Sequence, residues 1–158
     1  MTETEILLKG DCLVLLDELE QESVDLVVVD SPYRLNFTTG SATGSAKSES
    51  WQGTLRAGDP SANIKQTSFD GWLPKVYRVL KQKTHLYSFV NDKNIVAFIT
   101  AAQQAGFQLH NVLVWHKNNV TPNRWYMKNC EFVVFMRKGP AKPINELSSS
   151  QYHQVNNI

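Results

Sequence analysis

An unbroken apolar run, Leu-Val-Val-Val at residues 26–29, constrains the fold of this chain more than any other segment. It lies between Asp25 and Asp30 and shows no alternation of polar and apolar side chains. Strands that are covered on both faces have this pattern, and such strands are typical of parallel sheets. We therefore expect a buried parallel strand that ends at a carboxylate.

The other segments alternate between helical and strand patterns. The spacing of apolar residues predicts a helix over 12–19, a second that starts either after Ser68 or, because Pro74 interrupts the pattern, near Leu73, and a third that ends at Gly106. Ser68 is the candidate cap of the second helix, and Asn91 or Asp92 that of the third. Apolar runs predict further strands over 6–8, 84–90, 112–117 and 131–137.

This order predicts an α/β fold, a doubly wound Rossmann-like sheet with helices on both faces. The last two strands are close in sequence and should form an antiparallel hairpin at one edge. Gly, Ser and Thr are frequent after residue 35, so we expect a mobile loop over 35–66, either a functional lid or a plain insertion. Residues 1–140 then form one domain, and residues 141–158 a linker or a truncated tail.

The charge is small overall but unevenly distributed. The net charge is +1, yet residues 1–30 carry nine acids against Lys9 alone, whereas residues 117–142 carry six bases against Glu131 alone. This asymmetry suggests a face for phosphates, although solvated loops would give the same count.

Several functional classes are disfavoured by the sequence. Its apolar runs fall short of the roughly 18 residues that span a bilayer, so we expect no membrane partner. The acidic start, Met-Thr-Glu-Thr-Glu, is not typical of a secretory signal. Cys12 and Cys130 are far apart, which predicts reduced thiols, a cytoplasmic location and no metal site.

The tetrapeptide Asp30-Ser31-Pro32-Tyr33 directly follows the buried strand. Ligands of open α/β sheets bind outside the carboxyl ends of the strands. Asp30 offers an acceptor, Pro32 stiffens the turn, and Tyr33 offers a ring for stacking. This combination suits the exocyclic amino group of a flat base. The alternative is an ordinary turn in which Asp30 acts as a cap.

With its flanks, this segment resembles the permuted, beta-class DNA amino-methyltransferases. Their catalytic motif is usually [Asp/Asn/Ser]-Pro-Pro-[Tyr/Phe/Trp], and it follows Gly-Asp-Cys, a helix and Val-Asp-Leu. The matching segments are 9–12, 13–19, 24–26 and 30–33, followed by Trp72, 78–81 (Arg-Val-Leu-Lys), 115–117 (Trp-x-Lys) and 131–135 (Glu-Phe-Val-x-Phe). Each motif alone is weak, but their order and spacing are specific over about residues 5–140.

The resemblance implies a methyl transfer from S-adenosyl-L-methionine to an exocyclic amino group in double-stranded DNA. The initial Asp of the tetrapeptide is more similar to the N6-adenine type than to the N4-cytosine type. The implied catalytic residues are Asp30, Ser31, Pro32 and Tyr33, and the implied cofactor contacts are Asp11, Cys12 and Asp30. Asp30 and the Ser31 carbonyl would accept hydrogen bonds from the target amino group, on which Tyr33 would stack.

A basic aromatic stretch between the last two strands is the candidate DNA contact. Its residues for this role are Lys117, Asn123, Arg124 and Lys128, and a plain exposed loop is the alternative. Lys47, Arg56 and Lys65 of the long loop could also contact phosphates. His85 and His116 are interpreted as packing or surface residues.

The chain departs from the family pattern in two ways. Ser31 replaces the usual Pro, which leaves the carbonyl in place but makes the turn less rigid. The Phe-x-Gly-x-Gly segment that binds the cofactor is absent from residues 1–158. By family topology its strand would lie between the strands that end at Leu8 and Val29, so we expect an incomplete sheet.

Alternative functions follow from this departure. The chain could be an inactive DNA-binding or interaction remnant, or one half of a split methyltransferase. A homodimer or a complementing C-terminal fragment could cover the open edge. Methylation of an RNA base or of a protein glutamine is a third alternative.

Overall fold

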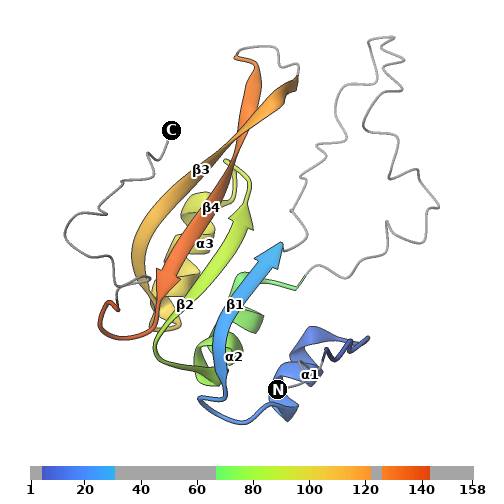
Figure 1. Ribbon diagram of the computed structural model, residues 1–158, viewed down its shortest axis with the longest axis vertical. Coiled ribbons are helices and arrows are strands. Elements are labelled where there is room, and N and C mark those ends of the chain that lie inside the picture. The colour runs from blue at the N-terminus through green and yellow to red at the C-terminus, as the bar shows by residue number, and fades with distance from the viewer. Residues whose placement is uncertain (1–4, 31–66, 122–125, 143–158) are drawn as a thin grey trace.

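A computed structural model of the chain describes residues 5–30, 67–121 and 126–142 (Figure 1). These residues form three helices and four strands. In chain order they are α1 (Cys12–Glu18), β1 (Val24–Asp30), α2 (Phe69–Val79), β2 (Leu80–Val90), α3 (Ile95–Gln104), β3 (Gln108–Thr121) and β4 (Lys128–Arg137). The predicted mobile loop and almost all of the predicted tail lie outside the described residues.

The four strands form one mixed sheet in the order β1-β2-β4-β3. β1 is parallel to β2, whereas β4 is antiparallel to both of its neighbours. The predicted α/β class and the antiparallel edge hairpin are therefore confirmed. β1 has no partner on its outer edge among the described residues, so the sheet is incomplete there, as expected.

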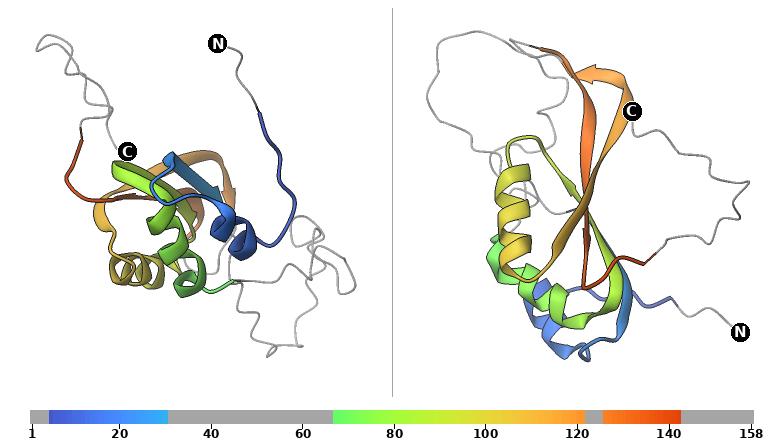
Figure 2. Two further views of the ribbon diagram at one scale, coloured as in Figure 1. Left: turned by 90° about the horizontal axis from the view of Figure 1, so that it is seen from below. Right: turned by 90° about the vertical axis from the view of Figure 1, so that its left-hand side faces the viewer.

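The described helices cover one face of the sheet (Figure 2). α2 buries Trp72, Leu73, Val76 and Val79, and α3 buries Phe98, Ala101 and Ala102. From the sheet, β2 and β4 contribute Leu86, Val90, Val134 and Met136 to the same core. Helices on both faces were predicted; those expected on the second face are not among the described residues.

The second helix begins at the earlier of its two predicted starts. α2 starts at Phe69 and contains Pro74, which lacks the N–H that would bond to the Asp70 carbonyl. Pro74 is the sixth of eleven helical residues, so α2 loses one internal hydrogen bond there. Before it, the Gly71 N–H bonds to the Ser68 carbonyl at 3.0 Å. Ser68 is the N-cap residue as predicted, but its side chain makes no cap hydrogen bond.

The ends of α3 follow local side-chain chemistry. Its N-cap is Asn94, not Asn91 or Asp92, because the Asn91 side chain instead accepts from the Asn94 N–H at 2.9 Å. After the helix, Gly106 has φ +104°, and a Cβ there would lie 2.9 Å from Tyr77 Cζ. Glycine is therefore required both by the backbone and by the close approach of α2.

The predicted strand over residues 6–8 is wrong. Residues 5–10 form neither helix nor strand, and Ile6, Leu7 and Leu8 are exposed. The reason is physical, since a strand needs a neighbour for its backbone groups, and β1 does not pair with this segment.

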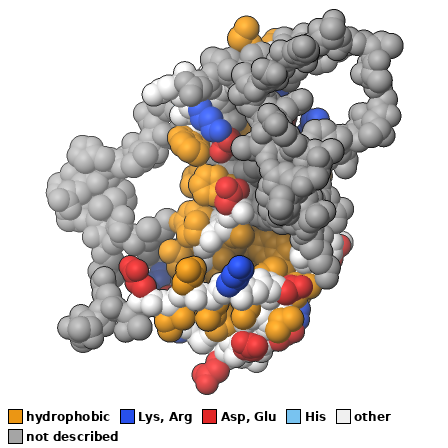
Figure 3. Space-filling model, turned by 90° about the vertical axis from the view of Figure 1, so that its right-hand side faces the viewer, with side chains coloured by type: hydrophobic (Ala, Val, Ile, Leu, Met, Phe, Trp, Pro, Cys, Tyr) orange, Lys and Arg blue, Asp and Glu red, His pale blue; other side chains and the backbone are white. Residues whose placement is uncertain are grey.

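The uncovered side of the sheet, here called the open face, is rich in apolar and aromatic residues. By strand alternation and ring contacts it carries Leu26, Val28, Asp30, His85, Tyr87, Phe89, His110, Trp115 and Phe135. Leu26 and Val28 are 52% and 62% exposed, although parallel strands are usually covered on both faces. Figure 3 views the side where β1 and α1 lie and shows apolar side chains gathered along it.

A buried lysine joins the ends of several elements. Lys138 is 3% exposed, and its ammonium donates to the Tyr77 carbonyl at 2.8 Å and to the Leu80 carbonyl at 2.7 Å. The same ammonium lies 3.2 Å from Glu22 Oε1 and 4.7 Å from the centre of the Tyr77 ring. It thereby links the C-terminus of α2 to the residue after β4 and to the turn before β1.

Replacement of this lysine should destabilise the fold. Lys138→Met keeps the aliphatic length but leaves two carbonyls without their donor, so we expect a loss of about 2–4 kcal/mol in the free energy of unfolding. Urea denaturation followed by circular dichroism measures it. The control is Lys81→Met, which removes the exposed ion pair with Asp25 and should change stability by less than about 1 kcal/mol. Equal effects of the two variants would contradict the role of Lys138.

Candidate active site

Asp30 is the last residue of β1, at the carboxyl end of the parallel pair. It is exposed and lies opposite Phe89 of β2 in the strand register. The Val-rich strand therefore delivers a carboxylate to the sheet edge at which α/β proteins bind ligands. Ser31, Pro32 and Tyr33, which complete the predicted catalytic segment, lie outside the described residues.

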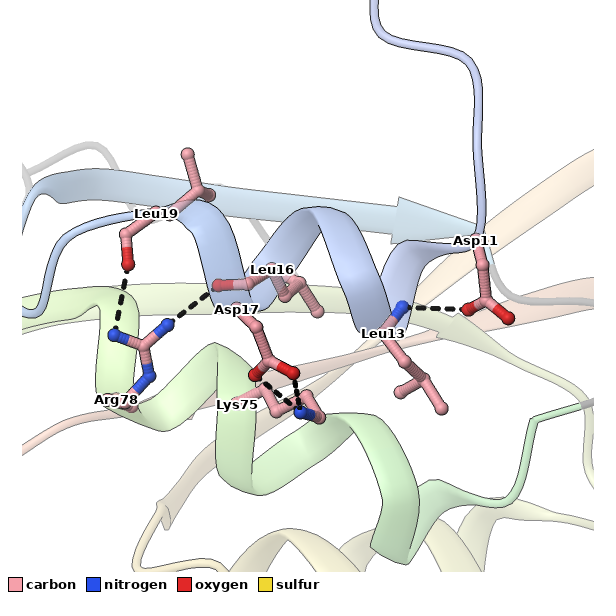
Figure 4. Close-up of polar contacts among 7 residues, drawn as sticks. All are labelled: Asp11, Leu13, Leu16, Asp17, Leu19, Lys75 and Arg78. Carbon is pink, nitrogen blue, oxygen red and sulfur yellow. Dashed lines mark hydrogen bonds and ion pairs between the residues drawn. The ribbon is translucent and has the colours of Figure 1, made fainter.

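Asp11 and Cys12 lie at the start of α1, and Figure 4 shows Asp11 there. Asp11 is the N-cap residue, and its Oδ1 accepts from the Leu13 N–H at 2.9 Å. Cys12 is the first helical residue and is exposed. The cap fixes the direction of the Asp11 carboxylate, which is one requirement for an ordered ligand contact.

Contacts with α2 hold α1 in place. Lys75 forms an ion pair with Asp17, and the Arg78 guanidinium donates to the carbonyls of Leu16 at 2.7 Å and Leu19 at 3.0 Å. These carbonyls belong to the C-terminal end of α1, where a cation also compensates the helix dipole. α1 is short and has no fully buried residue, so these polar contacts position Asp11 relative to the core.

Two predicted DNA-contact residues are already engaged within the hairpin region. Lys117 pairs with Glu131, and Lys128 pairs with Asp92, which follows β2. His116, predicted to be structural or solvent-facing, lies 2.9 Å from the Asn129 side chain. Asn123 and Arg124 lie outside the described residues, as do the lysines and arginine of the long loop. Lys117 and Lys128 therefore offer partly neutralised charges to a phosphate.

Two features near Asp30 were missed in the sequence. Asp92 was considered only as a helix cap, whereas it pairs with a lysine from another strand. Trp115 is 53% exposed, and its ring packs edge-on to Phe89 with centres 6.3 Å apart. The Trp-x-Lys pattern marked its strand, but only the register shows that it lies on the same face as Asp30.

His85 lies at the other end of the open face. Its ring packs edge-on to Phe135 with centres 4.9 Å apart, and Tyr87 stacks on Phe135 at 4.5 Å. Partial burial lowers the pKa of His85 from its ordinary value, and the nearby positive groups His110 and Lys142 lower it further. Partial burial also raises the pKa of Tyr87. The interpretation of His85 as a packing residue is therefore confirmed.

The described residues hold no group of three or more His, Cys, Asp or Glu side chains that could bind a metal ion. Cys12 and Cys130 are free thiols. None of the described helices is long and apolar enough to cross a membrane.

Solved structures share this arrangement of helices and strands. M1.HpyAVI in complex with SAM matches with a TM-score of 0.53 and 18% identity over 88% of this chain and 60% of that chain. TTHA0409 of Thermus thermophilus, complexed with S-adenosyl-L-methionine, matches with a TM-score of 0.56 and 19% identity over 90% and 56% of the two chains. The fold is that of these S-adenosylmethionine-dependent methyltransferases.

Sequence comparison defines the family. The profile of the N6/N4 DNA methylases matches residues 24–157, so the chain belongs to the N6/N4 DNA methylase family. Type II methyltransferase M2.LlaDCHI of Lactococcus lactis subsp. cremoris is 27% identical over 89% of this chain and 53% of its own length. M2.DpnII of Streptococcus pneumoniae is 26% identical over 87% and 52%. The chain spans about half the length of these relatives.

The histidine environment predicts a pH dependence of stability. Because the pKa of His85 is lower in the folded state than in the unfolded chain, the unfolded state binds more protons between the two pKa values. The contribution of His85 is therefore fully present above about pH 6.5 and is lost as the pH falls below that value.

His85→Phe keeps an aromatic ring in contact with Tyr87 and Phe135 but removes the imidazole that takes up a proton. We expect its unfolding free energy to decline less than that of the wild type between about pH 7 and pH 5. Urea denaturation at a series of pH values compares the two slopes. Identical slopes would show that His85 does not contribute.

Proposed function

We propose that this protein provides the base-binding part of a DNA methyltransferase that uses S-adenosyl-L-methionine and acts on the N6 amino group of adenine. The observation that carries the proposal is Asp30, an exposed carboxylate at the carboxyl end of a parallel strand and the first residue of the Asp-Ser-Pro-Tyr segment. Membership of the N6/N4 DNA methylase family supports the reaction class. The initial Asp favours adenine over cytosine by resemblance.

The proposed chemistry is a direct displacement at carbon. S-adenosyl-L-methionine supplies an electrophilic methyl group on a sulfonium sulfur. The amino nitrogen of the base would form the new C–N bond as the C–S bond breaks, the electron pair would return to sulfur, and the proton released from nitrogen would pass to solvent water. Asp30 accepts a hydrogen bond from the amino group and stabilises the positive charge that develops on nitrogen. Ser31 and Tyr33 would add a carbonyl acceptor and a stacking surface.

The described residues fit part of a cofactor site. Asp11, Cys12 and Asp30 are exposed, and two of them are carboxylates that can accept from donors or face a positive charge. Leu13 and Leu16 of α1 pack on the same core as Val27 and Val29, so α1 and β1 are held on one framework. The rest of the cofactor site would come from the sheet region beyond the free edge of β1.

The free edge of β1 supports a complementing partner. Residues 6–8 and β1 both expose apolar groups and do not pair with each other. An inserted parallel strand would satisfy both, as the family topology implies, and its helices would cover the apolar part of the open face around Leu26 and Val28. A segment with these elements, on this polypeptide or on a second one, fits better than a homodimer. Double-stranded DNA is the proposed substrate, and a cytoplasmic location is consistent with the free thiols.

A non-catalytic DNA-binding or interaction role is the second candidate. The observation that favours it is the open face itself, which exposes Leu26 and Val28 beside an unpaired strand edge among the described residues. Methyl-transfer assays separate the two candidates, because only the first candidate predicts methyl transfer that depends on Asp30.

The decisive variant is Asp30→Asn, which keeps size and polarity but removes the negative charge. We expect methyl transfer to fall about 100-fold or more, since the charge that develops on nitrogen loses its partner. Transfer of tritiated methyl groups to duplex DNA is the measurement. Duplex binding, measured by fluorescence anisotropy, should change little.

Asp25→Asn is the matched control, because Asp25 lies on the same strand but pairs with Lys81 instead of facing the site. It should leave methyl transfer nearly unchanged. Full activity of Asp30→Asn would contradict the assigned role. A wild-type protein that binds DNA but transfers no methyl groups, even when the complementing segment is supplied, would favour the non-catalytic candidate.

The ion pair between Lys128 and Asp92 leads to a prediction about the salt dependence of DNA binding. Asp92→Asn frees Lys128 from its ion pair and adds one positive charge to the hairpin. If Lys128 contacts phosphate, DNA affinity should rise and the slope of log affinity against log salt should steepen by about one. Anisotropy titrations at several salt concentrations measure both. An unchanged slope would remove Lys128 from the DNA interface.

A further inference from the structure

The open face is divided into two zones of different chemistry. The lower zone contains Leu26, Val28, Tyr87 and Phe135, which are apolar or packed on one another. The upper zone lies at the carboxyl ends of β1 and β2, and it combines charged groups with aromatic rings. Its members are Asp30, Phe89, Trp115, Lys117 and Glu131.

The upper zone is organised around the Trp115 indole. Its ring packs against the Phe89 ring at an interplanar angle of 76° and remains 53% exposed. The Lys117 ammonium lies 5.5 Å from the centre of the indole and also pairs with Glu131. The indole is therefore supported by one neighbour and keeps a large surface free, next to a cation.

This chemistry favours a nucleotide over a packed protein helix. A helix would need an apolar surface, as the lower zone offers, and would bury the ammonium and carboxylates of the upper zone at a high desolvation cost. A nucleotide has a flat base that stacks on an indole and a phosphate that attracts an ammonium.

The position relative to Asp30 limits which nucleotide can bind. Three strand spacings separate β1 from β3, so the backbones of Asp30 and Trp115 are roughly 14 Å or more apart. Phe89 fills part of this distance. A base held at Asp30 lies next to Phe89, which leaves the indole to a neighbouring nucleotide.

We propose that Trp115, supported by Phe89 and flanked by Lys117, stacks on a DNA base next to the nucleotide whose amino group Asp30 holds. This inference rests on the proposed function, because it takes DNA as the substrate. It adds a positioning residue that fixes the strand while the target base is out of the stack. Lys117 contributes charge to the adjacent phosphate.

The test compares Trp115→Leu and Trp115→Phe in the 158-residue chain. Trp115→Leu keeps apolar bulk without an aromatic face, so affinity for a labelled single-stranded oligonucleotide should fall about 5- to 100-fold. Trp115→Phe should retain most of the affinity. The control Leu26→Ala changes a residue of nearly equal exposure, 52%, in the lower zone and should leave affinity unchanged.

An oligonucleotide made of abasic sites distinguishes a loss of base stacking from a general loss of DNA binding. Trp115→Leu should bind it as the wild type does, since no base is present. Equal loss on both oligonucleotides would overturn the inference, as would equal affinity of Trp115→Leu and wild type for the ordinary one. Circular dichroism verifies that the variants are folded.

A parallel methyl-transfer assay distinguishes this inference from the proposed function. If Trp115→Leu binds DNA and transfers methyl groups like the wild type, the inference fails and the proposed function stands. If stacking on Trp115 is found, but the wild type transfers no methyl groups even when the complementing segment is supplied, the inference stands and the proposed function fails. A wild type that binds no DNA would overturn both.

Discussion

The Lys138 ammonium is the interaction on which the arrangement of the sheet depends. It occupies the C-terminal end of α2, where carbonyl groups have no helical partner, and supplies both donors and a positive charge. Backbone hydrogen bonds between Lys138 and its neighbours Lys83 and Thr84 extend the β2–β4 pairing to the same point. Hydrogen bonds from Gln82 and Lys138 lower the pKa of Glu22, so the turn before β1 holds its charge beside this ammonium. Polar stabilisation is thus concentrated at the end of the sheet opposite Asp30.

At the carboxyl ends of β1 and β2, by contrast, the charged groups are exposed instead of buried. Asp30 is exposed there, and Lys128 is paired with Asp92 at the surface. The Lys138 contacts stabilise one end of the sheet, and the exposed charges and aromatic rings lie at the other end. This separation is common in α/β proteins, because loops at the carboxyl edge are then free to serve ligands. The ion pairs of Lys117 and Lys128 keep the net charge of this edge low.

Sequence patterns predicted the elements that depend on local physics. The Val-rich strand and the antiparallel hairpin followed from β-branched runs and short connections. Patterns failed where a neighbour decides the outcome: the segment 6–8 has the composition of a strand but does not pair with β1. Pro74 left the start of α2 open between two positions, of which the earlier is correct. The position of Trp115 relative to Asp30 depends on the register across four strands, which spacing along the chain does not contain.

The parallel pairing of β1 with β2 has a consequence for the order of folding. β3 and β4 are joined by a short connection, whereas Leu26 must find His85 across the whole segment that includes residues 31–66. Leu26 and His85 are 59 residues apart and Thr121 and Lys128 only 7, so the first loop is about eight times longer. Closing it costs roughly 1.9 kcal/mol more, since the entropy term grows with the logarithm of length. The hairpin and α3 should therefore order first, and β1 should add last. Amide hydrogens of β1 would then exchange before those of the hairpin, and the segment that carries Asp30 would be the first part of the sheet to open.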